Sequence, residues 1–128
     1  MDRADYAECM AQGSENTIVY EVVAKLPSES IAERYVGWML NGHAAAVVAG
    51  GARAASVERL TESKDQGPIR VRSRYEFANM RAYESYVEHH APALRAEGQR
   101  LFPAAGGIEF SRSVWVLVGR IDATSSRS

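Results

Sequence analysis

The clearest strand in the sequence is Ile69-Arg-Val-Arg-Ser-Arg-Tyr-Glu-Phe77, because its side chains alternate in character. Odd-numbered positions are mostly apolar, and every even-numbered position is charged. Successive side chains of a strand point to opposite faces of the sheet, so the pattern predicts one face against a core and the other in water.

Three further strands are predicted around this one. Residues 53–61 form a strand that a polar turn, residues 62–68, joins to residues 69–77 as a hairpin. Residues 17–24 are rich in β-branched side chains and predict the first strand, and residues 108–118 predict the last.

The first helix is predicted to follow Pro27, where Ser28 or Ser30 can cap its N-terminus. Apolar side chains then recur at helical spacing at Ile31, Tyr35, Trp38 and Met39. Asn41-Gly42 interrupts this helix, and a short helical piece continues to Gly50-Gly51.

The second helix is predicted to run from about Met80 to Leu101, with Asn79 as the cap of its N-terminus. Pro92 lies within its pattern and predicts a kink or break near His89–His90, because proline cannot donate a backbone hydrogen bond.

The order strand, helix, strand, strand, helix, strand is that of a ferredoxin-like β-α-β-β-α-β domain, an α+β fold with a four-stranded antiparallel sheet. Two helices cover only one face of such a sheet. The sequence therefore predicts a homodimer in which two sheets pack together as a dimeric α+β barrel.

The length of 128 residues suits one domain, which we place at residues 16–119, with a flexible N-terminal arm at 1–15 and a flexible tail at 120–128. There are 15 basic and 16 acidic residues, and this balance predicts neither nucleic-acid nor membrane-surface partners. No secretory signal or long apolar run is present, which predicts a cytoplasmic protein.

Four sequence features carry a resemblance to a known family: Ile18-Val-Tyr-Glu-Val22, Tyr35-x-x-Trp38-Met39 followed by His43, Tyr75-Glu-Phe77, and His90-Ala-Pro-Ala-Leu-Arg95. Together they resemble an uncharacterised family of unknown function in the dimeric α+β-barrel superfamily, over roughly residues 17–117. The resemblance implies the dimeric barrel fold and brings no established activity. In that family a proline often follows the first histidine, whereas Ala44 and Ala45 follow His43 here.

Two histidines and one tyrosine are the candidate catalytic residues. His90 lies on the apolar stripe of the second helix, so we expect it to point toward the sheet and to act as an acid or base. His43 lies where the chain turns after the first helix and is expected to share a cavity mouth with Trp38. Tyr20 offers a hydroxyl for hydrogen bonding. The alternative for both histidines is structural, as a core side chain or a helix-end cap.

Candidate ligand-binding residues are Trp38 and Tyr75 as walls, with Arg72 and Arg95 as polar contacts. Arg72 belongs to a row with Arg70 and Arg74 that could receive a carboxylate or phosphate, or could pair with glutamates of neighbouring strands. Arg95 is expected to reach across the kink to a carboxylate or to the end of the first helix.

The spacing of histidines and the single cysteine, Cys9, predict no metal site, and no nucleotide or cofactor motif is present. Two functions stay open. One is a small-molecule-binding or cofactor-independent enzyme domain, an oxygenase or isomerase by fold analogy, with a cavity of a few hundred cubic ångströms that reaches His90 or His43. The other is a non-catalytic dimerisation or structural module with a filled core.

Overall fold

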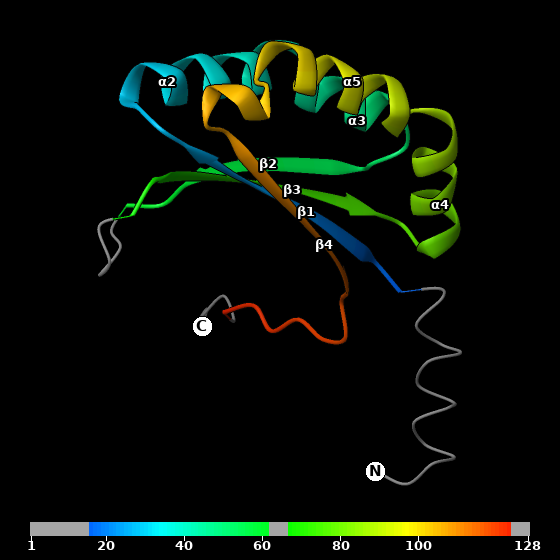
Figure 1. Cartoon of the computed structure of the whole chain (residues 1–128). Coiled ribbons are helices and arrows are strands. Elements are labelled where there is room, and N and C mark those ends of the chain that lie inside the picture. The colour runs from blue at the N-terminus through cyan, green and yellow to red at the C-terminus, as the bar shows by residue number, and fades with distance from the viewer. Residues whose placement is uncertain (1–15, 62–66, 124–128) are drawn as a thin grey trace, which may run out of the picture.

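Four strands form one antiparallel sheet in the computed structural model, which describes residues 16–61 and 67–123 (Figure 1). The elements follow in the order β1 (Ile18–Leu26), α2 (Glu29–Trp38), η1 (Met39–His43), α3 (Ala44–Ala49), β2 (Ala54–Arg59), β3 (Ile69–Phe77), α4 (Met80–His89), α5 (Ala91–Leu101), η2 (Ala104–Gly106) and β4 (Glu109–Val116). The predicted β-α-β-β-α-β order is confirmed. The predicted arm at 1–15, with Cys9, lies outside the described residues.

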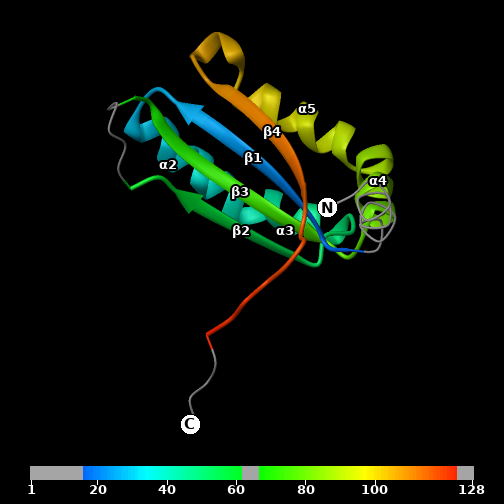
Figure 2. The same ribbon diagram turned by 90° about the horizontal axis from the view of Figure 1, so that it is seen from below.

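The strand order is β2-β3-β1-β4, with every neighbouring pair antiparallel. This is the ferredoxin-like arrangement, in which the first and third strands are central. Tyr20 on β1 lies opposite Tyr75 on β3 and Val114 on β4, so the three side chains share one face. The helices lie over this face, and the sheet viewed from the other side is uncovered by them (Figure 2).

Both helix starts are capped as the sequence predicts. The Ser28 hydroxyl accepts a hydrogen bond from the Ile31 N–H at 3.3 Å, and the Asn79 side-chain oxygen accepts one from the Ala82 N–H at 2.9 Å. Each bond satisfies a backbone donor that a helix start leaves without an intrahelical partner.

Both helical segments are interrupted where the sequence predicts it. The first widens into η1 at Asn41 and Gly42, which depart from helical backbone angles, and α3 then continues to Ala49. The second breaks at His90, whose φ of −125° and ψ of −39° separate α4 from α5. Pro92 lies in the first turn of α5, where its missing N–H costs no helical hydrogen bond.

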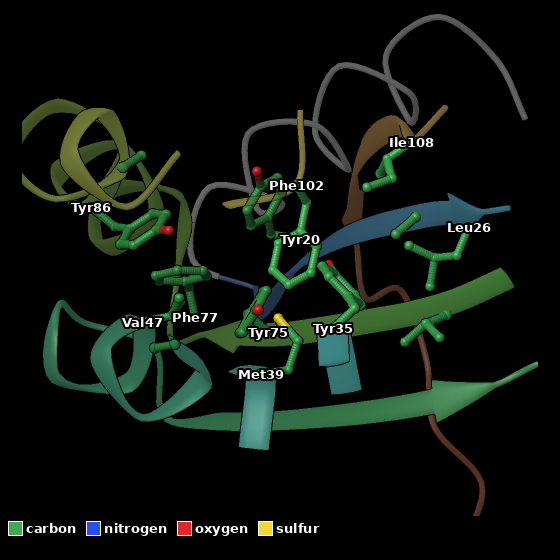
Figure 3. Packing of buried hydrophobic residues seen from close by; sticks show 14 of the residues in the cluster. Tyr20, Leu26, Tyr35, Met39, Val47, Tyr75, Phe77, Tyr86, Phe102 and Ile108 are labelled. Carbon is green, nitrogen blue, oxygen red and sulfur yellow. The ribbon is translucent and has the colours of Figure 1, made fainter. Parts of the chain in front are cut away.

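The core lies between the sheet and the helices, with Tyr20, Tyr35, Met39 and Tyr75 near its centre (Figure 3). The alternation of β3 is confirmed, because Val71, Ser73, Tyr75 and Phe77 are buried while Arg72 and Arg74 are exposed. Burial of so many large apolar side chains on one face is the main source of stability for a domain of this size.

The opposite surface of the sheet, which we call the helix-free face, includes Val19, Glu21, Glu58, Arg72 and Trp115. Arg72 forms ion pairs with Glu58 at 3.0 Å and with Glu21 at 3.8 Å. Most of this face is therefore charged rather than apolar, and its large apolar side chain is Trp115, which is 57% exposed. Within the described part of the chain, no helix is long and apolar enough to cross a membrane.

Candidate active site

A small cavity of about 40 Å³ lies on the helical side of the sheet, bounded by β1, β3 and β4 below and by α2, η1 and α5 above. Its polar or aromatic lining includes Tyr20, Tyr35, Trp38, His43, Ser73, Tyr75, Arg95, Phe110 and Arg112. The cavity is partly open rather than enclosed, and Arg112 on the edge strand β4 is exposed.

Two arginines meet at the Tyr20 hydroxyl. Arg95 Nη2, from α5, and Arg112 Nε, from β4, each donate to the Tyr20 hydroxyl oxygen at 3.2 Å. The Arg95 guanidinium also lies 5.9 Å from the centre of the Tyr20 ring. A tyrosine oxygen accepts two hydrogen bonds, so these two donors occupy it and leave its own proton available for donation.

His43 and Trp38 form a stacked pair on another wall. Their ring centres are 4.1 Å apart with an interplanar angle of 24°, and the indole N–H of Trp38 donates to Glu97 Oε1 at 3.0 Å. Burial lowers the pKa of His43 below its usual value, and the nearby Glu97 carboxylate opposes this shift only in part. The imidazole is therefore neutral at neutral pH and can accept a proton.

Three buried polar atoms at the cavity have no hydrogen-bond partner among the described residues: His43 Nδ1, the Tyr75 hydroxyl and Arg95 Nε. A buried polar group left without a partner costs about 1–3 kcal/mol. A volume of about 40 Å³ exceeds the roughly 10–15 Å³ that one water needs, so solvent or a ligand group can satisfy these atoms.

Three tyrosines around the cavity, Tyr35, Tyr75 and Tyr86, keep their protons. Burial raises the pKa of Tyr35 to about 12, although the positive charge of Arg112 opposes the shift. Burial likewise raises the pKa of Tyr75 and of Tyr86. Their hydroxyls can therefore donate hydrogen bonds to a ligand but cannot act as bases near neutral pH.

Five of the seven residues singled out from the sequence line this cavity: Tyr20, Trp38, His43, Tyr75 and Arg95. Arg72 does not, because it lies on the helix-free face in its ion pairs with Glu58 and Glu21. Its surroundings match the charge-pairing alternative rather than the ligand-binding one.

His90 also lies away from the cavity, and the expectation that it points toward the sheet is wrong. Its side chain is exposed, and it packs against Gly50, where an added β-carbon would lie 2.9 Å from His90 Cγ. The break at His90 ends the helical phase of α4, so the apolar stripe cannot be extended through it.

Two other contacts differ from the sequence analysis. Arg95 reaches Tyr20 rather than a carboxylate or the end of the first helix. Arg112 was not predicted, because the serines on either side of it give β4 no clear alternation of apolar and polar residues. Arg112 pairs with Val22 of β1, and this pairing places it on the helical side of the sheet. The two residues are 90 positions apart in the chain, so the local sequence does not reveal the pairing.

The cavity reaches His43 but is smaller than the few hundred cubic ångströms expected of an enzyme. Within residues 16–61 and 67–123 no group of three or more His, Cys, Asp or Glu side chains could hold a metal ion. The cavity therefore contains one neutral base, His43, together with tyrosine hydroxyl donors and two cations, Arg95 and Arg112.

Comparison with solved structures supports the fold. A dimeric ferredoxin-like protein from an uncultured marine organism is 14% identical, covers 84% of this chain and all of its own, and gives a TM-score of 0.61. A second dimeric ferredoxin-like protein from an uncultured marine organism is 12% identical, with 90% and 99% coverage and a TM-score of 0.61. An ethyl tert-butyl ether d (EthD) family protein from Bacillus halodurans is 12% identical, with 77% and 96% coverage and a TM-score of 0.59.

No curated protein matches the sequence. One family model matches residues 17–110, which is most of the chain and includes β1, β2, β3, the helices and all five cavity residues predicted from the sequence. The chain therefore belongs to the family defined by the domain of unknown function DUF4286.

Proposed function

We propose that this protein binds a small molecule in the cavity between sheet and helices and acts on it as a cofactor-independent enzyme. The observation that carries this proposal is the set of three buried atoms without partners, His43 Nδ1, the Tyr75 hydroxyl and Arg95 Nε, at one cavity. A purely structural core would be expected to pair such groups or to replace them with apolar side chains.

The roles follow from the chemistry of each side chain. Neutral His43 accepts a proton, Tyr20 donates a hydrogen bond, and Trp38 and Tyr75 form walls. The small volume admits the reacting group of a ligand, while the rest of the ligand lies toward the open side near Arg112. An isomerase acting on an enolisable substrate, or an oxygenase that adds molecular oxygen to the carbanion of such a substrate, fits this arrangement, because a neutral base can start either reaction by removing a proton from carbon.

We further propose that the protein is a cytoplasmic homodimer. Two solved proteins with this fold are dimeric. In this chain, large apolar side chains are exposed along and beyond the end of β4, at Trp115, Val118 and Ile121. Their burial against a second copy would remove apolar surface that a monomer leaves in water.

The two tryptophans allow a direct test of ligand binding. Trp38 lines the cavity, whereas Trp115 lies on the helix-free face. We expect small molecules from a mixed panel of neutral, cationic and anionic compounds to shift the Trp38 indole N–H resonance in ¹H–¹⁵N spectra and to leave that of Trp115 in place.

A panel in which no compound moves the Trp38 resonance would support the structural module instead. Shifts at Trp115 alone would place binding on the helix-free face and would also contradict the proposal. A His43→Gln variant that binds the same compound but no longer catalyses its proton exchange with solvent would support the role of His43 as the base.

A further inference from the structure

We infer that the ligand is an anion, a small organic carboxylate held between Arg95 and Arg112. This inference rests on the proposed function, because it names the class of molecule that the same cavity takes. Arg95 comes from α5 and Arg112 from β4, and Tyr20 on β1 holds both of them at one oxygen.

The charge balance of the site points to an anion. Arg95 and Arg112 form no ion pair with any aspartate or glutamate of the described residues. Other arginines of this chain have such partners, since Arg59 pairs with Glu29 at 2.6 Å and Arg72 with Glu58 at 3.0 Å. Two guanidiniums that share one neutral hydroxyl repel each other, and a bound anion would remove that repulsion.

The guanidinium N–H groups that have no hydrogen-bond partner among the described residues also indicate an anionic ligand. Arg95 bonds Tyr20 through Nη2, and its Nε is buried without a partner. Arg112 bonds Tyr20 through Nε, so its Nη groups are free of any hydrogen bond to the described residues. A guanidinium presents its donors in a planar fork that matches the two oxygens of a carboxylate, and the Tyr20 proton adds a further donor.

The surroundings favour a carboxylate attached to an apolar or aromatic body. The Arg112 guanidinium lies 5.8 Å from the centre of the Phe110 ring, and Phe110, Tyr35 and Trp38 line the same cavity. A volume of about 40 Å³ suits a planar carboxylate head, and because the cavity is partly open, the body of the ligand can extend outward past the exposed Arg112.

Benzoate and benzamide form a matched pair of probes, since they share size and shape and differ in charge. Isothermal titration calorimetry at constant chloride should show that benzoate binds the native protein more tightly than benzamide. Arg95→Gln and Arg112→Gln should each weaken benzoate binding by roughly tenfold to a hundredfold, the loss typical of a hydrogen bond to a charged group.

Arg81→Gln is the matched control, because Arg81 is an exposed arginine of α4 that does not line the cavity. It makes the same change of charge and should leave benzoate affinity unchanged. Arg112 is exposed, so its substitution tests the inference even if Arg95→Gln fails to fold.

The outcomes separate this inference from the proposed function. Equal binding of benzamide and benzoate, or benzoate binding that neither arginine variant weakens, would overturn the anion and leave small-molecule binding in place. If benzoate fails to bind while neutral compounds shift the Trp38 resonance, the anion is likewise excluded and small-molecule binding is retained. Inorganic phosphate that binds more tightly than benzoate would replace the carboxylate with a tetrahedral anion and would also contradict it.

Discussion

His43 is a titratable side chain that the fold holds in a partly buried place. The stacked Trp38 ring covers one side of the imidazole, and no described residue accepts from or donates to its Nδ1 atom. Desolvation disfavours the imidazolium, which is why the folded protein holds the pKa of His43 below the value of 6.5 that it has in an unfolded chain.

This difference predicts how stability depends on pH. Because the folded pKa is lower, the unfolded state takes up a proton first as the pH falls. The contribution of His43 to the free energy of unfolding is therefore complete above about pH 6.5 and is lost as the pH falls from there toward the folded pKa. Urea denaturation at about pH 7 and about pH 5 should show a larger loss for the native protein than for His43→Gln.

His90→Gln is the control for this experiment, because His90 is exposed and does not line the cavity. It should keep the pH dependence of the native protein. The same loss of stability in His43→Gln as in the native protein would show that desolvation of His43 does not set this dependence.

At the scale of elements, Gly50, the residue that follows α3, lies close to His90, the residue between α4 and α5. A β-carbon at this position would lie 2.9 Å from His90 Cγ and 3.1 Å from His90 Cβ, both next to the backbone of the neighbouring segment. The histidine cannot swing these atoms away as it could the end of a long side chain. Gly50 therefore allows the contact between the two halves of the helical layer.

Gly50→Ala should lower the free energy of unfolding by about 1–3 kcal/mol, as overpacking of a close contact does. Adding His90→Ala should recover part of this loss, because it removes the Cγ atom that lies nearest. Chemical denaturation of the two single variants and the double variant measures the coupling.

Gly37→Ala in α2 is the matched control, since its added β-carbon would meet only the Asn41 side chain at 3.9 Å. Alanine favours helix over glycine, so this variant should be as stable as the native protein or more so. Equal losses at Gly50 and Gly37, or no recovery with His90→Ala, would argue against the contact as the cause.

The elements show what the sequence could predict and what it could not. The alternation of β3, the caps at Ser28 and Asn79, and the break before Pro92 depend on neighbours in the chain, and all were predicted correctly. His90 was misplaced because helical periodicity was carried through that break. Arg112 and the partner of Arg95 depend on Tyr20, which lies 92 and 75 residues away, so no local pattern could reveal them.

At the scale of the whole molecule, the helix-free face of the sheet is not covered by any helix of the described chain. Much of the helix-free face carries paired charges, such as the ion pairs of Arg72. Water solvates such exposed charges well, so they do not need to be covered. Exposed apolar surface is instead concentrated near the end of β4, where Trp115 is 57% exposed and Val118 is 80% exposed. A dimer built on this surface would bury the end of the sheet rather than all of its face.

The proposed dimer predicts twice the monomer mass by light scattering after size-exclusion chromatography. Trp115→Lys should shift the protein toward monomer, because it places a charge where apolar surface would be buried. Leu40→Lys is the control: Leu40 is 65% exposed in the helical layer, and its substitution should leave the mass unchanged. A native protein that elutes as a monomer would contradict the dimer.

The position of Tyr20 has a consequence for the order in which the protein is made. During synthesis β1 emerges long before β4, which is the last strand of the described chain and pairs with Ile18 to Lys25 along one edge of β1. Until then that edge is open, and Tyr20 lacks the arginine that β4 supplies. A nascent chain on the ribosome can therefore pair β1 with β3 before the proposed binding site has its second arginine. Under the proposed function, that site is complete only when β4 has been released and has added to the sheet.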